Sequence, residues 1–312
     1  MRDSPLFYNY MEFNKEILSD LYRADGGNYI IGSLTEGYDF CKKIALGHYE
    51  NFPVGSALIP RNEQPHIYAI YAFARLADDV ADENHIGDKS EKINYLNKMA
   101  DYVVYPAAKI KGHPIFIPLR NTMTAKSIPS ELPLRLLEAF RRDVNFVQPE
   151  TIDDIYEYCH YSANPVGEML LRIFDVADES NIELSDEICT ALQMVNFWQD
   201  ISVDFKSERV YIPRKLLDKA GLNCKNFISS ENSDSLYSCL RELYEITEEK
   251  FARGKKLIPR LRPYRLKLEI AATVEGGLTI LKKCRELKGD IARIRPHINK
   301  FEMLTILLKA LL

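Results

Sequence analysis

Two pairs of aspartates with the same spacing are the residues of this chain most suited to chemistry. Asp78 and Asp82 form the first pair, and Asp200 and Asp204 form the second pair, more than a hundred residues further along. On an α-helix, residues four apart lie about 40° apart around the axis and roughly 6 Å apart along it, so each pair presents two carboxylates on one face. Two such faces that meet would form a cage for divalent cations.

Each pair continues a polar stripe along its predicted helix. Tyr71 and Arg75 precede the first pair at helical spacing, and Gln193 and Asn196 precede the second pair. At 100° per residue, each set stays within roughly 60 to 80° of the helix circumference. The apolar residues that point away from the stripes are Ile70, Phe73, Leu76, Val195 and Phe197. A single pair is typical of the solvated face of an amphipathic helix, but two pairs embedded in apolar and aromatic residues favour an internal site.

Carboxylates clustered in apolar surroundings need a positive partner, because they repel each other and are costly to remove from water. Oxygen ligands without interleaved histidine or cysteine favour Mg²⁺ over zinc or copper, and Mg²⁺ keeps positions for water and phosphate. Arg75 on the first stripe, and Arg209 and Tyr211 just after the second pair, add groups suited to hold a diphosphate. This pattern predicts ionisation of an allylic or cyclopropylcarbinyl diphosphate.

Four segments resemble the squalene/phytoene synthase family in their motifs, order and separation, and together they cover about residues 45–285. They are residues 71–83, 158–167, 193–204 and 209–213. The resemblance implies an all-α, isoprenoid-synthase-type helical bundle around a central apolar cavity. It also implies Mg²⁺ as the cofactor and a C15 or C20 prenyl diphosphate lipid as the substrate.

The resemblance also implies a role for individual positions. The expected metal ligands are Asp78, Asp82, Asp200 and Asp204. The residues expected to hold the diphosphate or face the reacting carbons are Tyr71, Arg75, Tyr158, Arg209 and Tyr211. The remaining residues expected to bind the substrate are Asn51, Phe73, Asn164, Gly167, Gln193 and Asn196. Asp143 would be a further carboxylate near the cluster.

Departures from the family pattern point to one branch of the family. Members that join two prenyl diphosphates usually carry a Ser-x-Ser element that grips a diphosphate, and Asn51 and Pro53 replace these serines here. Gln199 replaces the usual arginine before the second motif, and Glu208 replaces the usual glycine before Arg209. These features resemble the bacterial hydroxysqualene synthase branch of hopanoid and squalene biosynthesis. That branch ionises presqualene diphosphate, rearranges the cation and captures it with water.

Capture by water would need a polar side chain in the apolar pocket, and Asn164 or Asn51 could hold this water. The competing interpretation of Asn164 is structural, because an Asn-Pro pair kinks a helix and the asparagine can cap the break. The Gly-rich nicotinamide fingerprint is absent from the sequence, which favours water over hydride, although squalene synthases of this fold also lack it.

The predicted function is therefore that of a hydroxysqualene synthase, an enzyme of the transferase or lyase type. Two alternatives stay open. The first is a head-to-head condensing enzyme that makes presqualene diphosphate, squalene, dehydrosqualene or phytoene, and the second is an inactive family member that serves as an assembly or scaffold protein. A serine pair at positions 51 and 53 would favour the first alternative, and loss of a motif aspartate would favour the second. The sequence has neither feature.

The 312 residues are assigned to a single helical domain, residues 1–312, because motifs from both halves must meet in one cavity. Glycine is scarce, at 14 residues, and long stretches follow helical periodicity. We expect breaks at residues 111–133, where prolines recur, and a surface loop at residues 229–235. Residues 266–287 read as one helix that contains Gly276 and Gly277, which would allow either close helix packing or room for a prenyl chain.

A net charge of −4 and scattered lysines argue against a nucleic-acid partner. The six cysteines read as buried thiols of a reducing compartment. No signal-peptide core and no run of about 18 apolar residues is found, so we expect a cytoplasmic enzyme, either free or peripheral on the inner face of the membrane. The apolar segment 301–312 reads either as a core helix or as an interfacial membrane anchor.

Overall fold

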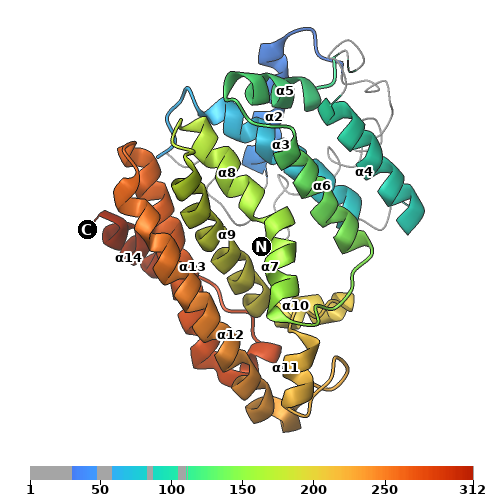
Figure 1. Ribbon diagram of the computed structural model, residues 1–312, viewed down its shortest axis with the longest axis vertical. Coiled ribbons are helices and arrows are strands. Elements are labelled where there is room, and N and C mark those ends of the chain that lie inside the picture. The colour runs from blue at the N-terminus through green and yellow to red at the C-terminus, as the bar shows by residue number, and fades with distance from the viewer. Residues whose placement is uncertain (1–29, 48–57, 83–86, 105–109, 111, 312) are drawn as a thin grey trace. The chain divides into compact units, whose positions relative to one another are not determined.

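The computed structural model describes residues 30–47, 58–82, 87–104, 110 and 112–311, and no strand occurs among them. The helices form two compact units, Met1–Asn145 and Phe146–Leu312 (Figure 1). The prediction of an all-α fold is confirmed. The assignment of residues 1–312 to a single domain stays a prediction.

The first unit is organised around α3 (Gln64–Asp82), which packs against four other helices of this unit. These are α2 (Leu34–Gly47), α4 (Lys89–Val104), α5 (Phe116–Ala125) and α6 (Glu131–Val144). Small alanines alternate with larger apolar residues along α3, so its neighbours approach closely, and Phe73 is fully buried against Phe116 with ring centroids 5.8 Å apart. The first aspartate motif therefore occupies the last turns of a helix that is held on several sides.

The second unit is organised around α9 (Glu179–Gln199), which packs against α7 and α8 and against α12 and α13 (Figure 1). The helices of this unit are α7 (Ile152–Ser162), α8 (Asn164–Ile173), α9, α10 (Ile201–Asp204), α11 (Arg214–Lys219), α12 (Ser233–Gly254), α13 (Tyr264–Leu287) and α14 (Lys300–Leu311). Short 3₁₀ turns join several of them, including η4 (Phe205–Ser207) and η7 (Lys288–Ala292). Asp178 caps the start of α9 by accepting the Asn181 N–H at 2.9 Å.

The end of α9 is fixed by a buried hydrogen bond. Trp198, the single tryptophan of the chain, is fully buried, and its indole N–H donates to the Thr247 hydroxyl of α12 at 2.9 Å. Thr247 in turn donates to the Leu243 carbonyl at 2.7 Å. A buried donor must be paired, so this bond sets the rotation of the last turn of α9. Asp200 follows two residues later.

The prediction of a helix over residues 266–287 is confirmed by α13. A Cβ atom at Gly277 would lie 2.6 Å from Phe251 Cζ and 2.9 Å from Leu192 Cδ2. Glycine therefore allows α13 to lie directly on α12 and α9. Close helix packing, rather than room for a prenyl chain, accounts for this glycine.

The proline-rich region was predicted as a break, and this prediction is correct only for residues 112–115 and 126–130, which lie outside the α-helices. Residues 111–133 contain the whole of α5 and the start of α6. Pro118 and Pro133 lie in the first turns of these helices, where the missing N–H would have no intrahelical partner in any case. Residues 229–235 form a 3₁₀ turn, η5 (Ser230–Asn232), and the first turn of α12, so the predicted loop is shorter than expected.

Two further expectations can be compared with side-chain exposure. All six cysteines are free thiols, and four of them are buried, but Cys224 is exposed, so the prediction of buried thiols is wrong there. Burial raises the pKa of Cys239 to about 12, which keeps this thiol protonated.

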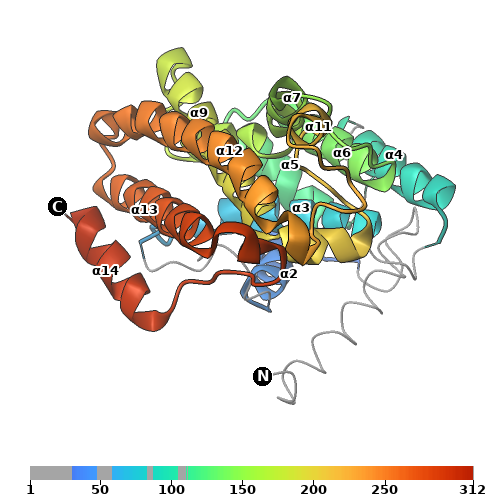
Figure 2. The ribbon, with the colours of Figure 1, turned by 90° about the horizontal axis from the view of Figure 1, so that it is seen from below.

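The core interpretation of residues 301–312 also fails, because α14 lies against α13 with Ile306 as its one buried residue (Figure 2).

Candidate active site

The first motif lies on α3, as predicted, and part of its negative charge is balanced by Arg75 within the same helix. Arg75 Nη1 lies 3.3 Å from Asp78 Oδ2, and Arg75 Nη2 lies 2.6 Å from Asp79 Oδ1. Asp79 is buried, whereas the Asp78 side chain is 42% exposed and Asp82 is exposed. Burial disfavours the charged guanidinium, but the two carboxylates outweigh this effect and the pKa of Arg75 is raised.

Arg75 also has an unused donor. Its Nε–H is buried, and no hydrogen-bond partner for it exists in the described part of the chain. A buried donor left unpaired costs about 1–3 kcal/mol. An oxygen anion that reached this face of α3 would remove that cost.

The second motif lies at a break between two helices, so the prediction of one continuous helix over residues 193–204 is wrong in detail. Asp200 has φ −99° and ψ 9°, and it separates α9 from α10. The helical hydrogen bonds continue across the break, because the Asp200 N–H donates to Asn196 O at 2.9 Å and the Asp204 N–H donates to Asp200 O at 2.8 Å. The two aspartates therefore remain one turn apart.

The chain then reverses through Glu208. This residue has φ 58° and ψ 23°, the left-handed conformation, at the position where the family pattern usually has glycine. The Arg209 N–H donates to Asp204 O at 2.9 Å and closes the turn. As a result, Asp204, Arg209 and Tyr211 line one small hollow together with Phe197.

Aromatic rings pack around Phe197 and Tyr211, two residues that line this hollow. Tyr211 stacks on Phe197 with ring centroids 3.9 Å apart and an interplanar angle of 12°. Tyr158 lies 5.8 Å from Phe197 and 6.1 Å from Tyr211, and Phe146 lies 5.1 Å from Tyr211, all as centroid distances. Helical periodicity places Phe197 off the polar stripe of its own helix. Because the chain reverses at Glu208, however, Tyr211 comes back to stack on Phe197. Phe197 and Phe146 are therefore site residues that the sequence reasoning missed.

Asn164 and Gly167 join α8 to α9. Asn164 is buried, and its Oδ1 accepts the Thr190 hydroxyl at 3.1 Å, so its side chain binds α9 rather than capping the break after α7. A Cβ atom at Gly167 would lie 2.4 Å from Ser185 Oγ and 2.5 Å from Cys189 Sγ. Gly167 therefore allows close packing of the two helices.

The other expected site residues are distributed as follows. Tyr71 is partly buried on α3, Phe73 is in the core of the first unit, and Asp143 is partly buried on α6. Gln193 is partly buried on α9, and Asn196 is exposed on the same helix. Asn51 and Pro53 lie outside the described residues.

Sequence reasoning also missed a cation at the second motif. Arg295, in the segment before α14, binds the Asp200 carboxylate through both Nε and Nη2, with Nη2 at 3.2 Å from Oδ2. Nothing local in the sequence indicates this pair, because 95 residues separate its members.

The carboxylates suit a hard cation that completes its coordination with other ligands. Among the described residues, no three His, Cys, Asp or Glu side chains lie close enough together to hold a metal ion by themselves. Asp78, Asp82, Asp200 and Asp204 all retain access to solvent. Oxygen donors of this kind fit Mg²⁺, which is commonly bound by one or two carboxylates, water and substrate phosphate.

A model of the squalene/phytoene synthase family matches residues 46–302. The chain belongs to this family. It is 35% identical to a hydroxysqualene synthase of Rhodopseudomonas palustris over 71% of this chain and 75% of the relative. It is 32% identical to a hydroxysqualene synthase of Sinorhizobium fredii over 83% of this chain and 87% of the relative.

A crystal structure of the squalene synthase HpnC from Alicyclobacillus acidocaldarius is similar, with a TM-score of 0.76 and 33% identity over 85% of this chain and 98% of that chain. The expected isoprenoid-synthase fold is thereby confirmed. As a member of the family, the chain is an enzyme of isoprenoid biosynthesis that uses prenyl diphosphates.

The left-handed conformation of Glu208 generates a stability prediction. Glu208→Gly should raise the free energy of unfolding by about 1 kcal/mol, because glycine removes the steric cost of this conformation. Glu208→Ala keeps the Cβ atom and serves as the control, with no such gain expected. Urea unfolding measures the free energy of unfolding of both variants. If glycine and alanine changed it equally, the loss of the glutamate side chain, and not the relief of backbone strain, would explain the change.

Proposed function

We propose that this protein is a hydroxysqualene synthase. It would ionise presqualene diphosphate with the help of Mg²⁺, allow the cation to rearrange, capture it with water and release diphosphate. The observation that carries the proposal is the grouping of side chains at the second motif, where the Asp204 carboxylate, the Arg209 guanidinium and the stacked rings of Phe197 and Tyr211 lie around one small hollow.

The side chains grouped around the second motif each suit one requirement of this reaction. The Arg209 guanidinium can hold a diphosphate through paired hydrogen bonds. The rings of Tyr211, Phe197 and Tyr158 offer π-faces that stabilise a carbocation. Such shielding allows a cation to rearrange before a nucleophile reaches it.

Asp78 and Asp82 of the first motif, and Asp200 and Asp204 of the second motif, would be the ligands of Mg²⁺. When bound, it neutralises the charge of the leaving diphosphate. The unpaired Nε–H of Arg75 adds a donor for an oxygen anion beside the first motif. The choice of presqualene diphosphate is supported by the names of the relatives and by Asn51 and Pro53, which replace a grip for a second diphosphate.

Removal of one motif carboxylate should abolish turnover. For Asp78→Asn or Asp200→Asn, kcat should fall at least about a thousandfold, equivalent to about 4 kcal/mol of transition-state stabilisation. Far-UV circular dichroism should remain unchanged, because both side chains are partly exposed. Asp101→Asn, on the exposed face of α4, is the matched control. Full activity in either motif variant, or in the wild type with EDTA, would contradict the metal assignment.

The product identifies the reaction. Purified protein with Mg²⁺ and NADPH in H₂¹⁸O should convert presqualene diphosphate to hydroxysqualene that carries ¹⁸O, and it should be slow with farnesyl diphosphate alone. Mass spectrometry of the lipid extract measures both outcomes. Rapid formation of presqualene diphosphate from farnesyl diphosphate would assign a condensing enzyme instead, and unlabelled squalene would assign hydride reduction.

We also propose that α14 docks on an anionic lipid surface. Phe301, Leu304, Leu308 and Leu311 are exposed and lie on one side of the helix at helical spacing, with Phe301 84% exposed. The opposite side carries Ile306 and faces α13. Exposed Lys300 and Lys309 flank the apolar stripe, as in helices that lie in the interface of an anionic bilayer. No helix in the described residues is long and apolar enough to span a bilayer.

Binding to vesicles tests this docking surface. Leu304→Ser/Leu308→Ser should weaken co-sedimentation with phosphatidylglycerol-containing vesicles at least about tenfold, because two leucines no longer enter the acyl region. Val147→Ser is the control, since Val147 is 82% exposed on another segment. Unchanged vesicle binding by the double variant would contradict the proposal. Dimers that dissociate only in the double variant would show that a second copy of the chain covers this face.

A further inference from the structure

The segment 293–299, here called the linker, connects η7 to α14 and contacts the second aspartate motif. Gln199, the residue before Asp200, donates its Nε2–H to Pro296 O at 2.7 Å. Arg295, the residue before Pro296, binds the Asp200 carboxylate. Two neighbouring residues of the linker are thus joined to two neighbouring residues of the motif.

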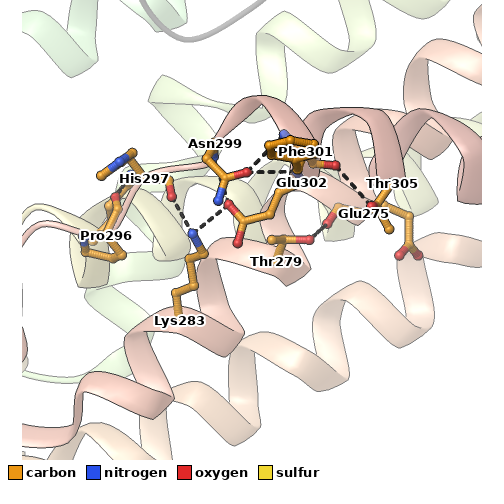
Figure 3. A network of polar contacts seen from close by, with 10 residues as sticks. Glu275, Thr279, Lys283, Pro296, His297, Asn299, Phe301, Glu302 and Thr305 are labelled. Carbon is orange, nitrogen blue, oxygen red and sulfur yellow. Dashed lines mark hydrogen bonds and ion pairs between the residues drawn. The ribbon is translucent and has the colours of Figure 1, made fainter.

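The other side of the linker is fixed to α13 and α14 (Figure 3). Lys283 of α13 donates to His297 O at 2.6 Å and to Glu302 Oε2 at 2.7 Å. The Glu302 N–H donates to Asn299 Oδ1 at 3.0 Å, and the Asn299 N–H donates to Glu302 Oε2 at 2.7 Å, which caps the start of α14. The backbone of the linker is therefore held independently of Arg295.

The ion pair between Arg295 and Asp200 is accessible to solvent. The side chains of Arg295 and Asp200 are 46% and 26% exposed, respectively. The guanidinium uses two donors on the two oxygens of one carboxylate, which leaves little room for another cation on that carboxylate. Because solvent reaches both side chains, a divalent cation, with twice the charge of the guanidinium, can compete for this carboxylate.

We propose that Arg295 is a positioning residue that holds the Asp200 carboxylate until a divalent cation replaces it. The guanidinium neutralises and orients Asp200 in the cation-free protein, and it leaves this carboxylate when the cation binds. The linker stays anchored through the Pro296 and His297 carbonyls, so only the side chain moves. This inference rests on the proposed function, in which Asp200 is a metal ligand.

The test compares stability and cation affinity in Arg295→Gln. In EDTA, the variant should unfold at lower urea concentration than the wild type, because Asp200 loses its partner. At saturating Mg²⁺ this difference should disappear, because the cation then occupies the carboxylate in both proteins. Calorimetric titration with Mg²⁺ alone should show about fivefold tighter binding to the variant, equivalent to about 1 kcal/mol. Trp198 fluorescence reports unfolding, since the chain has one tryptophan.

Three further variants separate the possible outcomes. Arg262→Gln, which removes an exposed arginine elsewhere, should change neither quantity. Gln199→Ala loosens the linker, and Arg295→Lys removes the paired contact with the carboxylate. Both variants should change the stability in EDTA and the Mg²⁺ affinity in the same direction as Arg295→Gln. They therefore serve as the test if Arg295→Gln fails to fold. A stability loss in Arg295→Gln that is equal with and without Mg²⁺, with unchanged Mg²⁺ affinity, would overturn the inference alone. Wild-type Mg²⁺ binding by Asp200→Asn would instead overturn the metal assignment of the proposed function, and the inference with it.

Discussion

The structure depends on one constraint, which is that aspartates close to an apolar core need a positively charged partner. The two motifs satisfy it by different routes. In the first motif, Arg75 lies three and four residues before Asp78 and Asp79, so the geometry of one helix makes both pairs. In the second motif, Asp200 receives its guanidinium from Arg295, far along the chain. The ion pairs of Arg75 need only α3 to form, whereas the pair of Asp200 with Arg295 requires most of the second unit to be folded.

Packing around the end of α9 makes the second solution possible. Trp198 is fixed to α12 through Thr247, and the preceding residue, Phe197, stacks on Tyr211. Consecutive residues thus hold the last helical turn on two sides, and Asp200 follows directly. Gly277 lets α13 approach α9 closely, and α13 carries Lys283, which anchors the linker. Residues that bind substrate or metal need this kind of support, because a site on a mobile turn loses its geometry.

The sequence predicted those features that are decided within a few residues. The periodicity of α3 and α13 is local, and both helices occur where it indicated. Prolines misled the prediction because a proline in the first turn is compatible with a helix, and only the structure shows that Pro118 occupies such a turn. The partners of Tyr211 and Asp200 were not predictable, because Phe146 and Arg295 reach them through tertiary packing.

Gln199 departs from the family pattern, and its side chain contacts a segment that lies almost a hundred residues further along the chain. An arginine at this position would place positive charge next to Asp200, and glutamine removes it. The same glutamine donates the hydrogen bond that fixes Pro296, and Pro296 follows the arginine that binds Asp200. In this chain, positive charge at the motif therefore comes from Arg295 of the linker, and residue 199 of α9 supplies none. An arginine on a linker can leave the carboxylate without disturbing the helix, because its backbone is held by other bonds.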